Sequence, residues 1–418
     1  MALRAIEHRT QTPQVAPSFA DWRARVVASG ARPIILVAGS RGKTTVVRVL
    51  DSIFRAAGLR TATWTDLGVE IDAVRQRGEL VPWSRVAMLL DQGKLDVAIQ
   101  EVDWLTIPTQ GLREEAFPLV IVTNVCANRE ACLIHGEAKL ATQLLPTVLA
   151  SATRDGVVVL NGEDFAVAGE EVPRERPEIL TALSKDVPLL RVRLQSGEIG
   201  AWLDEGQLVF GSQDAQEVIC QASELNFALH GAAGFHVHNA LSAAAAAILC
   251  GLPVELVGKA LRSYRPAPLR SPGSFNCIEI GEILAVVGRP EPSWFLRPVL
   301  RAMRDRKRLI TVAGTLDGVP EVDLPEVGRL LGRSSAAVVI HSEEERPERS
   351  EALRNGIALN EVPPPIVHTT TERRAVTRAL SLARPRDGIL VLADHPIPVL
   401  RALLRHAEIA AKRELTAD

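Results

Sequence analysis

The chain has 418 residues, of which 47% are hydrophobic and 23% charged, and its formal net charge is −2. This length predicts two or three domains with hydrophobic cores of their own. The balance of acids and bases leaves no electrostatic footprint for DNA or RNA, which argues against a nucleic-acid partner. The most apolar run, residues 240–254, is too short to span a bilayer, and the N-terminus lacks the apolar core of a signal peptide. We therefore expect a cytoplasmic protein, either free or held peripherally at a membrane by a partner.

Along the chain, an arm and one short helix are expected in residues 1–30. Short β-branched runs then alternate with segments of helical period. The expected strands are 33–39, 59–64, 95–102, 117–125 and 156–162, and the expected helices are 44–58, 84–93 and 139–152. This alternation predicts a mostly parallel sheet with helices on its faces.

The second half of the chain changes character twice. Between about residues 172 and 231 the pattern breaks into polar and glycine-containing pieces, which favour a small antiparallel patch. A long alanine-rich helix follows from Gly234, and the proline-rich stretch 265–274 predicts a linker. Strands and helices alternate again beyond it, so we expect a central α/β domain at 31–264 and a smaller Rossmann-like α/β domain at 275–418.

The segment "AGSRGKTT", residues 38–45, predicts a phosphate-binding loop. A strand ends near Ala38, two glycines allow a tight turn, and a helix begins near Lys43, so backbone N–H groups and the helix dipole face one spot. Lys43 is placed to reach β- and γ-phosphates, and the Thr44 hydroxyl to ligate Mg²⁺. Val37 stands where the long form of the motif has glycine, so the loop is of the short G-x-x-G-K-T type. A glycine-rich turn with a solvated lysine is the simpler interpretation. However, only seven of the 48 basic residues are lysine, and a lysine at this position suits a phosphate because its ammonium is a flexible point charge.

From this loop onward the sequence resembles the Mur ligase superfamily. "VAGSRGKTT" is similar to the phosphate loop of that family, and "VAIQEVDWLTI" lies where the family has a strand ending in a magnesium-binding glutamate. "FPLVIVTNV", "VVVLNGEDF" and "FHVHNAL" match later segments, and residues 271–288 and 309–341 are similar to the C-terminal domain. The N-terminal half looks closest to poly-γ-glutamate synthetases, and the C-terminal part to the ligase module of cyanophycin synthetases.

The resemblance implies a P-loop central domain, ATP and Mg²⁺ as cofactors, and the joining of a carboxylate to an amine through an acyl phosphate, with closure of the two domains to exclude water. Lys43, Glu101 and Arg129 are the implied catalytic residues, with Thr44 and Glu101 as magnesium ligands. The implied nucleotide contacts are Gly39, Ser40, Arg41, Gly42, Lys43, Thr44, Thr45, Asn239 and Asp317. Asn239 would contact adenine, and Asp317 would meet ATP from the second domain.

The sequence also departs from the family. "CANRE" replaces the usual Asp-His after "TNV", placing Asn128 and Arg129 where a histidine binds a second metal. A guanidinium has no acceptor lone pair, so Arg129 would supply fixed positive charge there, unless the site has decayed; His135 is a further candidate ligand. "GSFN" replaces "GRFE" at residues 273–276, and "VVGRPEP" replaces the segment that usually contains "DYAHNP".

Two functions stay open on this evidence. The first is an active ligase acting on amino acids or a poly-amino-acid chain, which the intact loop and Glu101 favour. The second is a catalytically weakened ATP-binding subunit that uses nucleotide as a conformational switch, within a membrane complex or as a homo-oligomer. The altered residues at 128–129 and beyond the linker favour the second.

Overall fold

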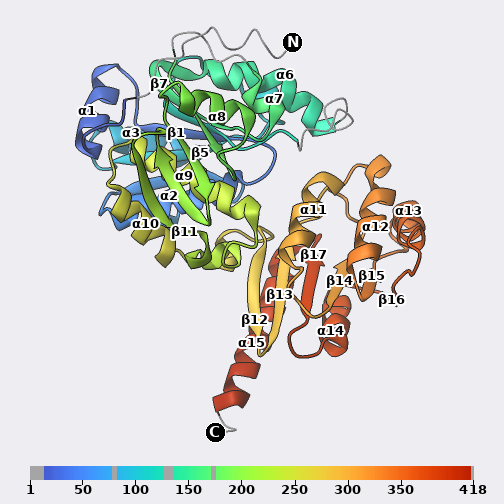
Figure 1. Cartoon of the computed structure of the whole chain (residues 1–418). Helices are drawn as coiled ribbons and strands as arrows, with labels where there is room; N and C mark the ends of the chain where they lie inside the picture. Colours follow the sequence, from blue (N-terminus) through green and yellow to red (C-terminus); the bar gives the residue numbers. More distant parts are fainter. Residues whose placement is uncertain (1–13, 78–81, 127–135, 171–175, 416–418) are drawn as a thin grey trace. The chain divides into compact units, whose positions relative to one another are not determined.

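The computed structural model describes residues 14–77, 82–126, 136–170 and 176–415. By its internal contacts the chain divides into two compact units, residues 1–265 and 266–418. Figure 1 shows both units as sheets covered by helices. The predicted α/β class, with a mostly parallel first sheet, is confirmed.

The described part of the first unit contains an 11-stranded sheet in the order β11-β10-β9-β8-β7-β6-β1-β5-β2-β3-β4. The strands from β9 through to β2 are parallel, whereas β3, β4, β10 and β11 pair antiparallel at the two ends. Their bounds are β1 Ile34–Ala38, β2 Thr61–Thr65, β3 Gly68–Ile71, β4 Val74–Arg75, β5 Val97–Glu101, β6 Phe117–Val122, β7 Ala152–Asn161, β8 Glu178–Ala182, β9 Gly200–Asp204, β10 Gln207–Gly211 and β11 Gln216–Gln221.

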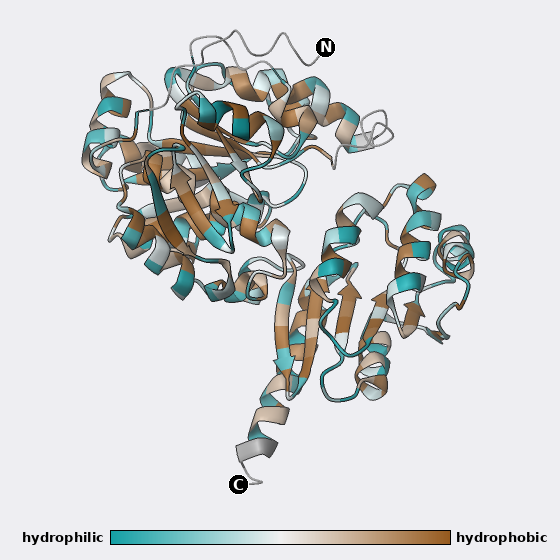
Figure 2. Ribbon diagram, in the orientation of Figure 1, coloured by the Kyte–Doolittle hydropathy of each residue, from teal (hydrophilic) through white to brown (hydrophobic). Residues whose placement is uncertain are grey.

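Helices α2, α9 and α10 pack against one another and against this sheet. The alanines of α9 from Ala243 to Ala247 are fully buried, because small side chains let α2 and the strands approach closely. The helices of the unit are α1 Phe19–Ala28, α2 Lys43–Ala56, α3 Pro82–Asp91, α4 Ile107–Gln110, α6 Gly136–Ala150, α7 Phe165–Ala168, α8 Pro188–Gln195, α9 Gly234–Leu249 and α10 Val254–Ser263. Figure 2 shows the strands of the sheet mostly in the hydrophobic colour, as expected for strands buried on both faces.

The predicted antiparallel patch between residues 172 and 231 is only partly right. Strands β9, β10 and β11 do form an antiparallel meander. However, β8 pairs parallel with β7 and with β9, and helix α8 crosses between β8 and β9. The segment therefore extends the main sheet. Helix α8 is short and buries only Leu190 and Leu194, which is too few residues for a helical period to stand out in the sequence.

A buried ion pair fastens α2 to the β2–β3 end of the sheet. Arg48 of α2 donates through Nη1 to Glu70 Oε2 at 2.8 Å, and the two side chains are only 3% and 8% exposed. The same guanidinium lies 3.3 Å from Thr63 Oγ1 and 3.4 Å from Thr65 Oγ1. A charge pair enclosed by hydroxyls is satisfied as long as both partners remain.

The second unit contains, in its described residues, a six-stranded sheet in the order β12-β13-β17-β14-β15-β16. All neighbours are parallel except β12, which pairs antiparallel with β13. The elements are β12 Asn276–Ile280, β13 Ile283–Gly288, α11 Ser293–Ala302, β14 Leu309–Ala313, α12 Leu324–Ser334, β15 Ala337–His341, α13 Pro347–Ala358, β16 Ile366–Thr369, α14 Glu372–Leu382, β17 Gly388–Leu392 and α15 Pro396–Leu415. Apolar residues of α14 and α15 pack on the strands to form the core of this unit.

Four cysteines lie among the described residues. Cys126, just beyond β6, is disulfide-bonded. Cys220, Cys250 and Cys277 are free.

Candidate functional site

The predicted phosphate loop connects β1 to α2 at the carboxyl end of the parallel strands, where ligands bind in open α/β sheets. Gly39 and Gly42 have φ values of 138° and 90°, a backbone region that side chains disfavour. A Cβ on Gly39 would lie 2.0 Å from Thr123 Oγ1, so only glycine fits this close approach. No side chain caps the start of α2, which leaves its first-turn N–H groups facing the loop.

The loop is held from the neighbouring strand β6 by two residues that the sequence did not single out. Asn124 Oδ1 accepts from the Arg41 backbone N–H at 2.9 Å, and its Nδ2 donates to the Arg41 carbonyl at 2.9 Å. Thr123 Oγ1 donates to the same carbonyl at 2.7 Å, and the Asn124 carbonyl accepts from the Ser40 N–H at 2.8 Å. These contacts fix the loop before any ligand binds. The sequence contained a signal, because Thr123 and Asn124 directly follow the apolar run that forms β6.

Three of the predicted residues converge beside the loop. Thr44 Oγ1 donates to Glu101 Oε2 at 2.8 Å, and Lys43 Nζ lies 4.0 Å from Glu101 Oε1. Glu101 reaches this position because β5 pairs with β1, with Val37 opposite Glu101. The side chains of Lys43 and Glu101 are each about 10% exposed, so the ion pair is largely shielded from solvent.

Glu101 is a carboxylate whose charged form is disfavoured by burial. Burial raises its pKa above the ordinary value, and the Lys43 ammonium and Thr44 hydroxyl oppose that shift. Asp66 and Asp103 add to the rise. A buried carboxylate and a hydroxyl in contact are hard oxygen donors of the kind that Mg²⁺ prefers, so the residues fit the predicted ion.

Asn239 lies in the first half of α9, directly against the loop. It is buried, and a Cβ on Gly42 would come within 2.4 Å of its Oδ1. Its Nδ2 lies 3.5 Å from Nδ1 of His236, and burial lowers the pKa of His236 to about 3, which keeps that ring neutral. Asn239 is thus placed next to the loop, while a contact with adenine stays a prediction.

The remaining predicted residues lie outside the described residues or in the second unit. Asn128, Arg129 and His135 lie outside the described residues. Asp317 belongs to the second unit, where it is 60% exposed and lies 3.9 Å from Arg349 Nε. Its meeting with ATP therefore stays a prediction.

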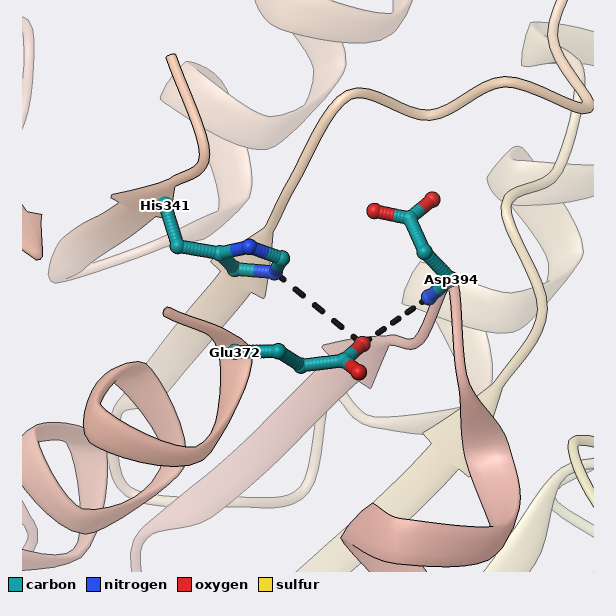
Figure 3. Close-up of side chains that lie close together, drawn as sticks. All are labelled: His341, Glu372 and Asp394. Atoms are coloured by element: carbon teal, nitrogen blue, oxygen red, sulfur yellow. Dashed lines mark hydrogen bonds and ion pairs between the residues drawn. The ribbon is translucent and has the colours of Figure 1, made fainter. Parts of the chain in front are cut away.

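A second cluster, which the sequence did not reveal, lies at the carboxyl edge of the sheet in the second unit. It comprises His341, Glu372 and Asp394, whose ligand-type atoms all lie within 4.8 Å of one another (Figure 3). Burial lowers the pKa of His341 to about 4, with His395 adding to the effect, so its ring is neutral at pH 7. Burial is also the main cause that raises the pKa of Glu372 and of Asp394.

No family model matches the chain. Over 387 residues it is 27% identical to a cyanophycin synthetase of Trichormus variabilis, an alignment that covers 90% of this chain and 42% of that protein. It is 23% identical over 369 residues to the UDP-N-acetylmuramoyl-L-alanyl-D-glutamate–2,6-diaminopimelate ligase of Syntrophomonas wolfei, covering 86% of this chain and 72% of that one. The chain thus spans less than half the length of the cyanophycin synthetase.

Among solved structures, E. coli FolC in complex with DHPP and ADP matches with a TM-score of 0.61 and 16% identity, over 97% of this chain and 96% of that chain. At this identity the match shows a shared fold. Together with the sequence relatives, it confirms the predicted resemblance to the Mur ligase superfamily. Within the part of the chain that the structure describes, no helix combines the length and apolar character needed to cross a membrane.

Proposed function

We propose that the chain is an ATP-dependent ligase that joins a carboxylate to an amine through an acyl phosphate, releasing ADP and phosphate. The observation that carries the proposal is the convergence of Lys43, Thr44 and Glu101 on the uncapped start of α2. Relatives named as ligases of amino-acid-containing substrates support the same reaction class.

The residues of the loop have distinct roles in this reaction. The first-turn N–H groups of α2 bind phosphate oxygens, and Lys43 balances the negative charge on the transferred phosphoryl group. Thr44 and Glu101 would hold Mg²⁺, which would neutralise negative charge on the phosphates. Magnesium-bound ATP supplies the activated phosphoryl group. Asn124 and Thr123 keep the loop in shape, since the Ser40 and Arg41 N–H groups are already bound to Asn124.

The substrate class we propose is an amino acid or a growing poly-amino-acid chain. The likeness to cyanophycin synthetase, which covers 90% of this chain, supports it. A poly-γ-glutamate-like substrate is the narrower form, which rests on the likeness of the N-terminal half noted above. The switch-subunit alternative draws no support from the relatives, whose names are those of ligases.

The test is ADP release with a panel of amino acids and their oligomers, paired as carboxylate and amine partners, with mass spectrometry of the products. We expect ADP release that depends on a particular pair and matches one new amide per ADP. ATP bound tightly with no pair raising turnover would contradict the ligase and favour the switch subunit.

Replacing Glu101 with glutamine is expected to raise the Mg²⁺ concentration for half-maximal activity by at least about tenfold, because an anionic ligand is lost. The same substitution is expected to leave the ligand-free protein as stable as the wild type or more stable at pH 8. Because burial raises the folded-state pKa of Glu101, the wild type loses stability as the pH rises through that value, and glutamine avoids this loss.

The Mg²⁺ dependence is measured as activity against Mg²⁺ concentration. The stability difference is measured by thermal unfolding without ligand at pH 5 and pH 8. Glu114→Gln is the matched control, since Glu114 is an exposed glutamate of the same unit. The assignment of Glu101 as a buried magnesium ligand is contradicted if Glu101→Gln shows the wild-type Mg²⁺ dependence. It is also contradicted if the stability of the variant relative to wild type falls from pH 5 to pH 8.

A further inference from the structure

The cluster of His341, Glu372 and Asp394 gathers three different segments of the second unit. His341 is the last residue of β15, Glu372 the first of α14, and Asp394 follows β17. Strands β17, β14 and β15 are parallel neighbours, so these residues meet at the edge where the strands end. Figure 3 shows the imidazole and both carboxylates arranged around one point.

Nε2 of the His341 imidazole faces the space between the three side chains. His341 is only 2% exposed, and its Nε2 is buried with no hydrogen-bond partner. The nearest carboxylate oxygen, Oε1 of Glu372, lies 4.0 Å away, beyond hydrogen-bond reach. Oδ1 of Asp394 is likewise buried and unpartnered. Buried polar atoms are normally satisfied, so two unpartnered atoms within one cluster indicate a missing ligand.

The surrounding contacts orient the three side chains as outer contacts orient metal ligands. His341 Nδ1 lies 3.0 Å from Ser342 Oγ, which can accept its proton and leave the lone pair on Nε2. Glu372 Oε1 accepts from the Asp394 N–H at 2.9 Å. Asp394 Oδ2 accepts from the Thr315 N–H at 3.2 Å.

Gly314, the residue after β14, leaves space between the three side chains because it has no Cβ. A Cβ there would lie 2.2 Å from Asp394 Oδ2 and 2.7 Å from His341 Nε2. Any larger residue at position 314 would therefore occupy the space between the His341 and Asp394 side chains.

We propose that His341, Glu372 and Asp394 bind a first-row divalent metal ion of the Zn²⁺ or Mn²⁺ type. One imidazole nitrogen with two carboxylates suits these ions, whereas Mg²⁺ prefers oxygen ligands alone. Metal–donor distances of about 2.0–2.1 Å place neighbouring donors of a tetrahedral site about 3.3 Å apart. The donors here lie within 4.8 Å, so they close on the ion by side-chain rotation. The ion ties β15, α14 and β17 together, and water completes its coordination.

The experiment uses the full chain, untagged, in a Glu101→Gln background that removes the proposed magnesium ligand of the first unit. The protein is stripped with a chelator and titrated calorimetrically with Zn²⁺ and with Mn²⁺, in the presence of millimolar Mg²⁺. Further samples carry Glu372→Gln or Asp394→Asn, which keep the shape of each side chain. His368→Ala is the control, because His368 is a half-exposed histidine of the same unit paired with Glu343.

We expect one equivalent of Zn²⁺ or Mn²⁺ to bind despite Mg²⁺, and each isosteric variant to weaken binding at least about tenfold. Co²⁺ bound in the same place should show the visible absorption of a nitrogen–oxygen site, and that absorption should disappear in both variants. The proposal fails if neither ion binds, if the two variants bind as the parent does, or if His368→Ala removes the binding. Because the readout is metal binding, it is independent of whether the chain is a ligase.

Discussion

Replacing Lys43 with alanine is expected to lower amino-acid-dependent ADP release by about 10²–10³-fold, the usual effect of removing one group that stabilises developing charge. Lys43 lies at the start of α2, and its ammonium is 4.0 Å from Glu101, where a transferred phosphoryl group would be held. Steady-state ADP release under saturating ATP measures the effect. The wild-type rate is compared with that of the variant at the same Mg²⁺ concentration.

Lys94→Ala is the matched control, because Lys94 is an exposed lysine of the same unit. Thermal unfolding of both variants separates lost chemistry from lost folding. A Lys43→Ala enzyme that keeps its rate within a few-fold of wild type would show that the loop does not act on the transferred phosphate.

Replacing Glu70 with alanine is expected to destabilise the first unit by about 3–5 kcal/mol, because Arg48 would be left as a buried charge without its carboxylate. The double replacement Arg48→Met with Glu70→Leu should recover most of that loss, since apolar side chains of similar size need no partner. Urea unfolding followed by tryptophan fluorescence measures both, and five of the six tryptophans lie in the first unit.

The control is Asp91→Ala, which removes an ion pair with Arg32 whose side chains are 52% and 51% exposed. It should cost much less stability than Glu70→Ala does, because solvent screens an exposed pair. If Glu70→Ala and Asp91→Ala lower the free energy of unfolding equally, burial of the Arg48–Glu70 pair does not increase its contribution to stability.

The sequence predicted the strand–turn–helix geometry of the loop at residues 38–45 because the parts of that segment are contiguous. A strand, two glycines and a lysine specify one local geometry, whatever the rest of the chain does. Glu101 could be predicted as well, since a polar residue at the end of a buried strand faces the edge where ligands bind. The same rule applied to the strands ending at His341 and before Asp394 would have found the cluster in the second unit.

Contacts between distant segments depend on which strands become neighbours in the sheet, and the local sequence pattern does not predict that order. Asn124 clamps Arg41 only because β6 lies beside β1. Glu372 joins His341 only because α14 begins at the same sheet edge. Strand β8 and helix α8 were missed because they have only 5 and 8 residues, too few for a period to stand out among the polar and glycine-containing pieces around them.

Formation of an acyl phosphate is tested most directly by oxygen-18 transfer. The carboxylate substrate that stimulates ADP release is labelled with ¹⁸O and incubated with the enzyme, ATP, Mg²⁺ and the amine. One ¹⁸O atom is expected in each phosphate released, because the carboxylate oxygen attacks the γ-phosphorus and leaves with it when the amine displaces the acyl group. Unlabelled phosphate, or label found in AMP instead, would contradict an ADP-forming ligase.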